Sequence, residues 1–303
     1  MGLKNLLQKH SYVWLSLIVV VTWGLVPALA KLGDLPGGLT TLYVNWFAVA
    51  GILIIMSLNG SIWELKRAVP YRKLILIGLV WPFVYSILYF NSVHIGSPAL
   101  TTIANYFWPV FYLFLASLFF GKRFLVESWL VVIVAVVAVT VPLLLEGGLN
   151  LIILPLILGL GAAASQAWFN LTTEKPAADP WVTTLVIEIV TAVGSTIYVL
   201  FFEQLVVPSL TTLGYLGIIG VFSNGIGFWA FQRSGNESDK LGERANINRL
   251  MILCLTPLIQ VVLLPILGVE SVKPARWIGV VLISLGLVGY HLLSTKRESE
   301  NNK

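Results

Sequence analysis

The chain has 303 residues, of which 57% are apolar and 11% are charged, and its mean hydropathy is +0.89. Soluble domains carry roughly 25% charged residues, so this sequence has too little charge to cover a soluble surface of its size. The composition argues against a soluble enzyme, a disordered chain and a nucleic-acid-binding protein, even though the net charge is +5. It predicts an integral membrane protein.

Apolar runs of about 20 residues follow one another along the chain, and this is the length that a helix needs to cross a hydrocarbon core of roughly 30 Å. The segments between them are mostly short and contain Gly, Pro and charged residues. The sequence therefore predicts an all-α integral membrane protein with ten transmembrane helices. The expected spans are 13–32, 41–59, 73–93, 98–119, 127–146, 152–172, 182–202, 211–231, 247–268 and 275–294.

The basic residues predict the orientation of these spans. If the N-terminus is cytoplasmic, 16 of the 19 Lys and Arg residues lie in cytoplasmic segments and only Lys31, Lys273 and Arg276 lie outside. An excess of Lys and Arg in cytoplasmic loops is typical of membrane proteins. We therefore expect a multi-pass protein of the cell (inner or plasma) membrane with both termini in the cytoplasm. The first apolar run is expected to be a retained span rather than a cleaved signal peptide.

Several landmarks recur along the chain at a nearly constant offset. Pro109 and Pro257 lie 148 residues apart, and so do Trp129 and Trp277. Recurrence in the same order predicts an internal duplication.

The duplication divides the chain into residues 1–147 and residues 148–303, each with five spans, and a short cytoplasmic tail ends the second half. Because five is an odd number, the second repeat must cross the membrane in the opposite sense to the first. Inverted repeats are typical of secondary transporters, which bind substrate near the midplane and work by alternating access.

Aromatic residues recur in the third span at helical spacing. Trp81, Tyr85 and Tyr89 are four residues apart and are expected to share one face of a helix. Two interpretations compete for them. Aromatic residues near span ends often form a belt at the membrane interface. A buried phenol needs a partner for its hydroxyl group, which favours a polar cavity instead.

The fourth span contains a predicted helix break. Pro109 follows Asn105, Tyr106 and Trp108, and Pro257 holds the matching place in the ninth span. Proline removes a backbone donor and leaves a carbonyl without its helical partner, which is tolerated where protein or water replaces that partner. Such a break could bind the ammonium group of a substrate, or it could serve helix packing alone.

Glu188 is a carboxylate well inside the seventh span. An ionisable residue within a membrane is a candidate functional group, here for coupling transport to protons. The competing interpretation is a structural hydrogen bond to a neighbouring helix. No His, Cys and carboxylate spacing indicates a metal site, and no catalytic or nucleotide-binding motif is found, so neither a cofactor nor enzymatic activity is expected.

Three motifs resemble a known family. The run G-S-P-A at 96–99 followed by N-Y-F-W-P at 105–109 resembles the fourth span of the drug/metabolite transporter (DMT) superfamily, EamA type, and T-W-G at 22–24 resembles its first span. The N-Y-F-W-P run is similar to the YddG-type aromatic amino-acid exporters. The resemblance implies ten spans in two inverted repeats around a central cavity. The residues that it implies for the cavity lining are Tyr85, Tyr89, Tyr106, Trp108 and Trp168.

The expected function is export of aromatic or hydrophobic amino acids by a secondary transporter. Together with Asn105, the aromatic residues implied by the resemblance would bind the substrate. Uptake or exchange of another solute, such as an amine, a nucleoside or a drug-like compound, is the alternative, and an integral membrane enzyme is a more distant one. The expected partners are a small-molecule substrate and the lipid bilayer, without nucleic acid. The exact substrate, the direction, the coupling and the choice between monomer and homo-oligomer are left open.

Overall fold

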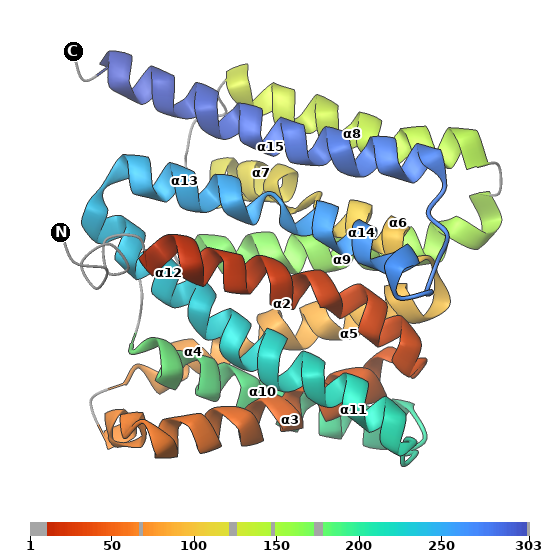
Figure 1. Ribbon diagram of the computed structural model, residues 1–303, viewed down its shortest axis with the longest axis vertical. Helices are drawn as coiled ribbons and strands as arrows, with labels where there is room; N and C mark the ends of the chain where they lie inside the picture. The colour runs from red at the N-terminus through yellow and green to blue at the C-terminus, as the bar shows by residue number, and fades with distance from the viewer. Residues whose placement is uncertain (1–10, 67–68, 121–125, 147–148, 173–177, 302–303) are drawn as a thin grey trace.

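The computed structural model describes residues 11–66, 69–120, 126–146, 149–172 and 178–301, and these residues form helices and short connections without a strand. The helices run side by side between two opposite edges of the molecule (Figure 1). The start of α2 and the end of α15 lie at the same edge, called here the terminal side. The opposite edge is called the distal side.

The first half of the described chain forms α2 (Ser11–Gly33), α3 (Gly37–Leu58), the 3-10 helix η1 (Ser61–Lys66), α4 (Tyr71–Gly78), η2 (Leu79–Val84), α5 (Tyr85–Ile95), α6 (Pro98–Asn105), α7 (Trp108–Phe120) and α8 (Val126–Glu146). The second half forms α9 (Leu149–Thr172), α10 (Pro180–Phe202), α11 (Leu210–Ile218), η3 (Ile219–Gly227), α12 (Phe228–Leu241), α13 (Glu243–Leu253), α14 (Thr256–Ile266) and α15 (Pro274–Asn301).

Within the described residues, eight helical stretches are long and apolar enough to cross a membrane. They correspond to all the expected spans except the fifth and the tenth. The fifth and tenth are helical as well, as α8 and α15, and the apolar helical stretches described in them are 132–142 and 274–289. The structure therefore confirms an all-helical protein with several membrane spans, and the count of ten in two repeats stays a prediction.

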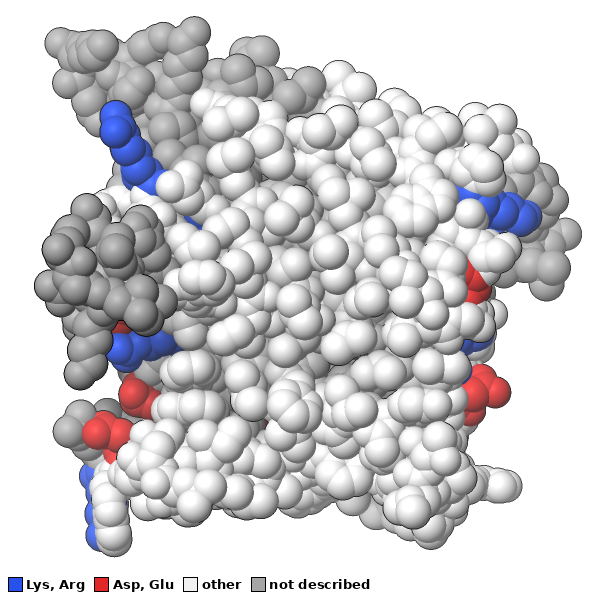
Figure 2. Space-filling model, viewed as in Figure 1, with Lys and Arg blue, Asp and Glu red and all other residues white. Residues whose placement is uncertain are grey.

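On the face shown in Figure 2, the charged side chains lie at the two edges of the molecule, with a broad uncharged belt between them. The helices cross this belt in the same view, and many of their large apolar side chains are exposed on its surface. A soluble protein rarely exposes so much contiguous apolar surface, whereas a hydrocarbon environment requires it.

Four of the helical stretches depart from a regular α-helix near their middle, either by a break or by a π-helical segment, and we call all four broken. Trp81 has an extended backbone (φ −143°, ψ 129°) and precedes Pro82, so α4 and α5 are not one continuous helix. The π-helical segment η3 separates α11 from α12. The other two breaks lie between α6 and α7 and between α13 and α14. Each comes just before a proline at which a break was predicted, Pro109 or Pro257.

These last two breaks have the same hydrogen-bond pattern. At the first break the N–H groups of Tyr106 and Phe107 donate to the carbonyls four and three residues earlier. At the second break the N–H groups of Cys254 and Leu255 donate in the same way. Each residue of one break is 148 positions from its counterpart in the other, which is the offset that separates the two prolines.

Polar contacts join helix ends on the distal side. The Glu203 carboxylate accepts hydrogen bonds from the N–H groups of Gly38 and Leu39, at 3.0 and 2.9 Å, where α3 begins. A negative charge is favourable at a helix N-terminus, where N–H groups lack helical partners. The Lys31 ammonium group, at the end of α2, donates to three carbonyls between Val93 and Gly96.

A second distal contact holds α6 against the connection between α14 and α15. The Ser97 hydroxyl accepts from the N–H of Leu100 and donates to the Glu270 carboxylate, at 3.2 and 2.6 Å. Glu270 forms an ion pair with Arg276. Both charged side chains are largely buried, at 15% and 12% exposure. We call Ser97, Glu270 and Arg276 the distal cluster.

Helices α3 and η3 approach each other closely at Gly220. A Cβ atom on this glycine would lie 2.3 Å from the Val44 carbonyl oxygen and 2.7 Å from the Phe47 Cβ. The first of these atoms belongs to the backbone, so it cannot turn aside as a long side chain can. By contrast, a Cβ atom on Gly214 would meet nothing within 4 Å.

We therefore predict that Gly220→Ala destabilises the protein by about 1–3 kcal/mol, because the added methyl group forces α3 and η3 apart. Gly214→Ala is the matched control, and we expect it to leave stability unchanged or slightly raised, since alanine favours a helix. Thermal unfolding of the purified variants in detergent measures both effects. Equal stability of the two variants would contradict the close approach.

Candidate functional site

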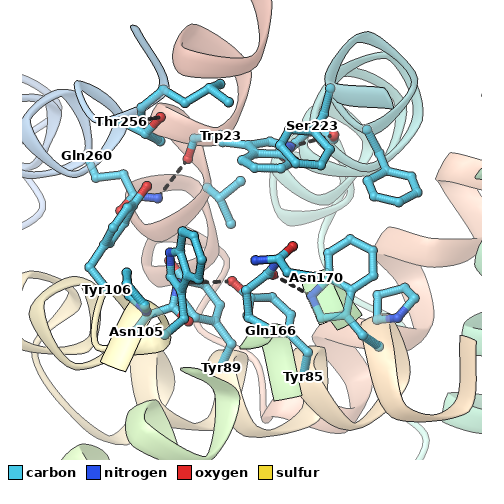
Figure 3. Close-up of a pocket in the computed structure, with 18 of the residues that line it drawn as sticks. Trp23, Tyr85, Tyr89, Asn105, Tyr106, Gln166, Asn170, Ser223, Thr256 and Gln260 are labelled. Carbon is cyan, nitrogen blue, oxygen red and sulfur yellow. Dashed lines mark hydrogen bonds between the residues drawn. The ribbon is translucent and has the colours of Figure 1, made fainter. Parts of the chain in front are cut away.

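A cavity of about 530 Å³ lies in the centre of the helix bundle (Figure 3). Its volume is within the range of roughly 300–1,000 Å³ that is typical of small-molecule sites. Helices from both halves of the chain line it, and the four broken stretches all contribute residues. Because a break exposes backbone and side chains that a continuous helix would cover, the helices bring polar groups to this point of an apolar bundle.

Five of the six predicted substrate-binding residues line this cavity: Tyr85, Tyr89, Asn105, Tyr106 and Trp108. Pro109 and Glu188 line it as well. Pro257 is buried nearby in α14 and lies outside the lining.

Trp168, the sixth predicted residue, does not point into the cavity. It packs edge-on against Phe119, with a distance of 5.7 Å between ring centroids. The cavity is lined instead by Gln166 and Asn170, two residues before and after it. Residues two positions apart lie on different faces of a helix, which explains how the neighbours of Trp168 face the cavity when Trp168 faces α7.

Tyr85 and Tyr89 form one wall of the cavity. Their rings stack with 5.5 Å between centroids and an interplanar angle of 11°. The Asn105 amide nitrogen donates to the Tyr85 hydroxyl at 3.2 Å. Tyr89 is only 2% exposed, so these phenols line the cavity and do not form an interfacial belt.

Trp81 lies beside this wall, although its extended backbone means that it does not share a helix face with Tyr85 as the spacing predicted. Its indole N–H donates to the Gln166 side-chain oxygen at 2.6 Å. The Gln166 amide nitrogen in turn donates to Asn170 at 3.2 Å. The Trp81 ring stacks on Phe169 with 4.0 Å between centroids. These contacts fix the ring where the helix is broken.

The two proline-associated breaks meet at the cavity. The Tyr106 hydroxyl forms a hydrogen bond with Thr256, the first residue of α14. Cys254, in the second break, is buried in the apolar cluster against which Tyr106 and Phe107 pack. Corresponding segments of the two halves are therefore in direct contact.

Trp23 connects the first span to two other broken stretches. Its indole N–H donates to the Ser223 carbonyl of η3 at 3.2 Å. Its own backbone carbonyl accepts from the Gln260 amide nitrogen of α14 at 3.1 Å. Both dashed contacts are visible at the top of the close-up (Figure 3).

The cavity wall carries one acidic and one basic side chain. Glu188 is 1% exposed and forms a hydrogen bond with Asn224, whose amide nitrogen also lies 3.3 Å from the Asn45 side-chain oxygen. Arg249 donates to the Ser234 hydroxyl at 2.8 Å and to the Phe231 carbonyl at 2.9 Å. Its guanidinium group also lies 4.6 Å from the centroid of the Phe231 ring.

The arrangement can bind a small molecule that has both an apolar ring and polar groups. Flat aromatic faces offer stacking and cation–π contacts, while a few amides, hydroxyl groups and charges can fix its orientation. Within the ranges that the structure describes, no group of three or more His, Cys, Asp or Glu side chains could hold a metal ion.

Residues 10–144 match the EamA-like transporter family. No curated protein matches the chain. A solved structure described only as "Crystal structure of protein" has a TM-score of 0.68 and 18% sequence identity, covering 93% of this chain and 96% of that chain. At this identity the likeness concerns the fold alone.

The first half of the chain is therefore similar to the EamA-like transporter family, within the DMT superfamily. This match agrees with the family that the motifs indicated, and the family suggests a membrane transporter of small solutes. It does not extend to the exporter subtype.

Gln260 and Arg249 are among the polar residues of the cavity that were not identified from the sequence. Gln260 is the only amide side chain in the stretch 250–268, and its isolation in an apolar run is a signal that could have found it. Arg249 was counted among the basic residues of the cytoplasmic side. Because α13 begins at Glu243, Arg249 is in the second turn of a helix and reaches the cavity.

The placement of α9 predicts different reactivity for two neighbouring positions. With Cys254 replaced by alanine, we expect Asn170→Cys to react several-fold faster with a water-soluble maleimide than Trp168→Cys. The reason is that thiol reactivity requires access to water, which the cavity offers and the contact with Phe119 does not. Labelling after denaturation in SDS serves as the control for both variants. Faster labelling at position 168 would show that α9 is rotated.

Proposed function

We propose that the protein is a secondary transporter that exports aromatic or other hydrophobic amino acids across the plasma membrane by alternating access. The observation that carries this proposal is the central cavity, which has aromatic walls and few polar groups and lies where four broken helical stretches meet. Broken helices at the midplane are a recurring feature of substrate sites in secondary transporters.

The proposed architecture is ten spans in two inverted repeats, residues 1–147 and 148–303. The equivalent hydrogen bonds at the α6–α7 and α13–α14 breaks support it, since they recur at an offset of 148 residues. Broken stretches also occur in the third and eighth expected spans, which correspond under the same division. The helices α8 and α15, which would be the last span of each repeat, pack side by side (Figure 1).

In the proposed orientation in the membrane, both termini lie in the cytoplasm. The described ends of the chain lie at one edge of the molecule, and two of the three basic residues expected outside, Lys31 and Arg276, lie at the other. The cavity reaches towards the terminal side, because Asn170 is two residues from the end of α9 and Arg249 is near the start of α13. On the distal side, the contacts of Glu203, Lys31 and the distal cluster hold the helix ends together. In the proposed orientation, an opening towards the terminal side is that of an inward-facing state.

Transport by the purified protein in liposomes tests the proposal. We expect radiolabelled phenylalanine and tryptophan to cross faster than in empty vesicles. Trp108→Ala is expected to slow this flux at least several-fold, because the substrate loses a stacking face. Trp129→Ala is the matched control, since Trp129 is 57% exposed on α8 and lies outside the cavity. If neither amino acid crosses faster than in empty vesicles, the proposed substrate class is wrong.

We further propose that Glu188 couples export to proton movement, because it is a buried carboxylate at the cavity wall. A pH gradient across the liposome should accelerate phenylalanine flux in the wild type. In Glu188→Gln this acceleration should disappear while exchange of phenylalanine at equal pH persists. Glu237→Gln, a change at a carboxylate paired with Arg233 and Lys240 outside the cavity, should keep the acceleration. Acceleration that survives in Glu188→Gln would exclude this role.

A further inference from the structure

Four buried oxygen atoms at the cavity wall have no hydrogen-bond partner within the described part of the chain. They are the Tyr89 hydroxyl, the side-chain oxygens of Asn105 and Gln260, and one carboxylate oxygen of Glu188. These side chains are between 1% and 7% exposed. A buried polar group without a partner costs about 1–3 kcal/mol, so such a group in a native protein calls for an explanation.

The orientation of the Gln260 amide is fixed by chemistry. Its nitrogen donates to the backbone carbonyl of Trp23, and a carbonyl can only accept, so the nitrogen must face Trp23 and the oxygen must face away. The Asn105 amide nitrogen donates to the Tyr85 hydroxyl. Both amides therefore leave an acceptor oxygen unpartnered.

These acceptors belong to segments that contact one another. Asn105 is the last residue of α6, and Gln260 lies one turn into α14. The hydrogen bond between Tyr106 and Thr256 joins the end of α6 to the start of α14. Tyr89 lies one turn after Tyr85, which Asn105 contacts. In the close-up, Tyr89, Asn105, Tyr106 and Gln260 are grouped on one side of the cavity (Figure 3).

We infer that the side-chain oxygens of Gln260 and Asn105, together with the Tyr89 hydroxyl, form a subsite for the protonated amino group of the substrate. An ammonium group has three N–H donors and no acceptor, which matches three acceptor atoms. The carboxylate of Glu188 on the same cavity adds a favourable negative charge. The inference rests on the proposed function, since it assigns a place to the amino group of the proposed substrate.

Three related compounds distinguish the contribution of the amino group to binding from that of the carboxylate and the ring. Phenylalanine has both an amino and a carboxylate group, phenethylamine lacks the carboxylate, and 3-phenylpropanoate lacks the amino group. Binding to the purified full-length protein in detergent is measured by isothermal titration calorimetry. We expect the wild type to bind the two amines at least about tenfold more tightly than 3-phenylpropanoate, as hydrogen bonds to a charged group are worth roughly 1.5–3 kcal/mol.

Gln260→Leu removes one acceptor while keeping the side chain near its size. It should weaken binding of phenylalanine and phenethylamine about tenfold and leave 3-phenylpropanoate nearly unchanged. Gln260→Glu keeps an acceptor and should retain binding of both amines. Gln232→Leu is the matched control: the Gln232 amide bonds to Thr184 and lies outside the cavity lining, so this variant should bind all three compounds as the wild type does. Thermal unfolding of each variant identifies any general loss of structure.

The results distinguish this subsite from the proposed function. If the wild type binds 3-phenylpropanoate as tightly as phenylalanine, or if Gln260→Leu changes all three affinities by the same factor, the ammonium subsite is wrong while amino-acid binding stands. If phenethylamine binds and responds to Gln260→Leu but phenylalanine does not bind, the subsite stands and the proposed amino-acid function fails. Binding of none of the three compounds overturns both.

Discussion

Inside an apolar belt, a polar group must find its hydrogen-bond partner within the protein, and this constraint shapes the whole structure. The buried hydroxyl groups of Ser16, Thr41, Thr184 and Thr191 meet it locally, because each donates to the carbonyl four residues earlier, at 2.7–2.9 Å. These residues need no partner from another helix. The cavity differs, because its amides and phenols bond across helices and still leave acceptor atoms without a partner among the residues that the structure describes.

The same constraint explains where the helices break. A broken stretch leaves backbone groups without helical partners, so it is stable only where other groups replace them. At the α6–α7 and α13–α14 breaks the backbone turns more tightly, with N–H groups bonding three residues back, and η3 meets the Trp23 indole through the Ser223 carbonyl. Because such positions are few, the breaks come together around one cavity instead of being scattered through the bundle.

The fold was largely readable from the sequence, because runs of apolar residues are long enough to mark the membrane-crossing helices directly. The prolines at 109 and 257 also predicted two of the breaks. The break at Trp81 was not foreseen, since a spacing of four residues between Trp81 and Tyr85 is equally consistent with a continuous helix.

The candidate site was predicted in part. Aromatic residues near the predicted fourth-span break reach the cavity because the break itself positions them. Trp168 was assigned by resemblance, and the rotation of α9 about its axis, which decides which of positions 166, 168 and 170 faces inward, is set by packing against other helices. Gln260 and Arg249 were missed for a similar reason: the partners that give them a role, Trp23 and Phe231, are distant in the sequence.

The short length of helix α6 affects how movement at the cavity reaches the distal side. It has only eight residues, about 12 Å, and is too short to absorb a displacement by bending. One end carries Asn105 at the cavity, and the other begins beside Ser97, where Glu270 and Arg276 are bound. We therefore expect a shift of Asn105 to move the loop that contains Glu270, so an environment-sensitive fluorophore on this loop, at the distal side, would report when the central cavity is occupied.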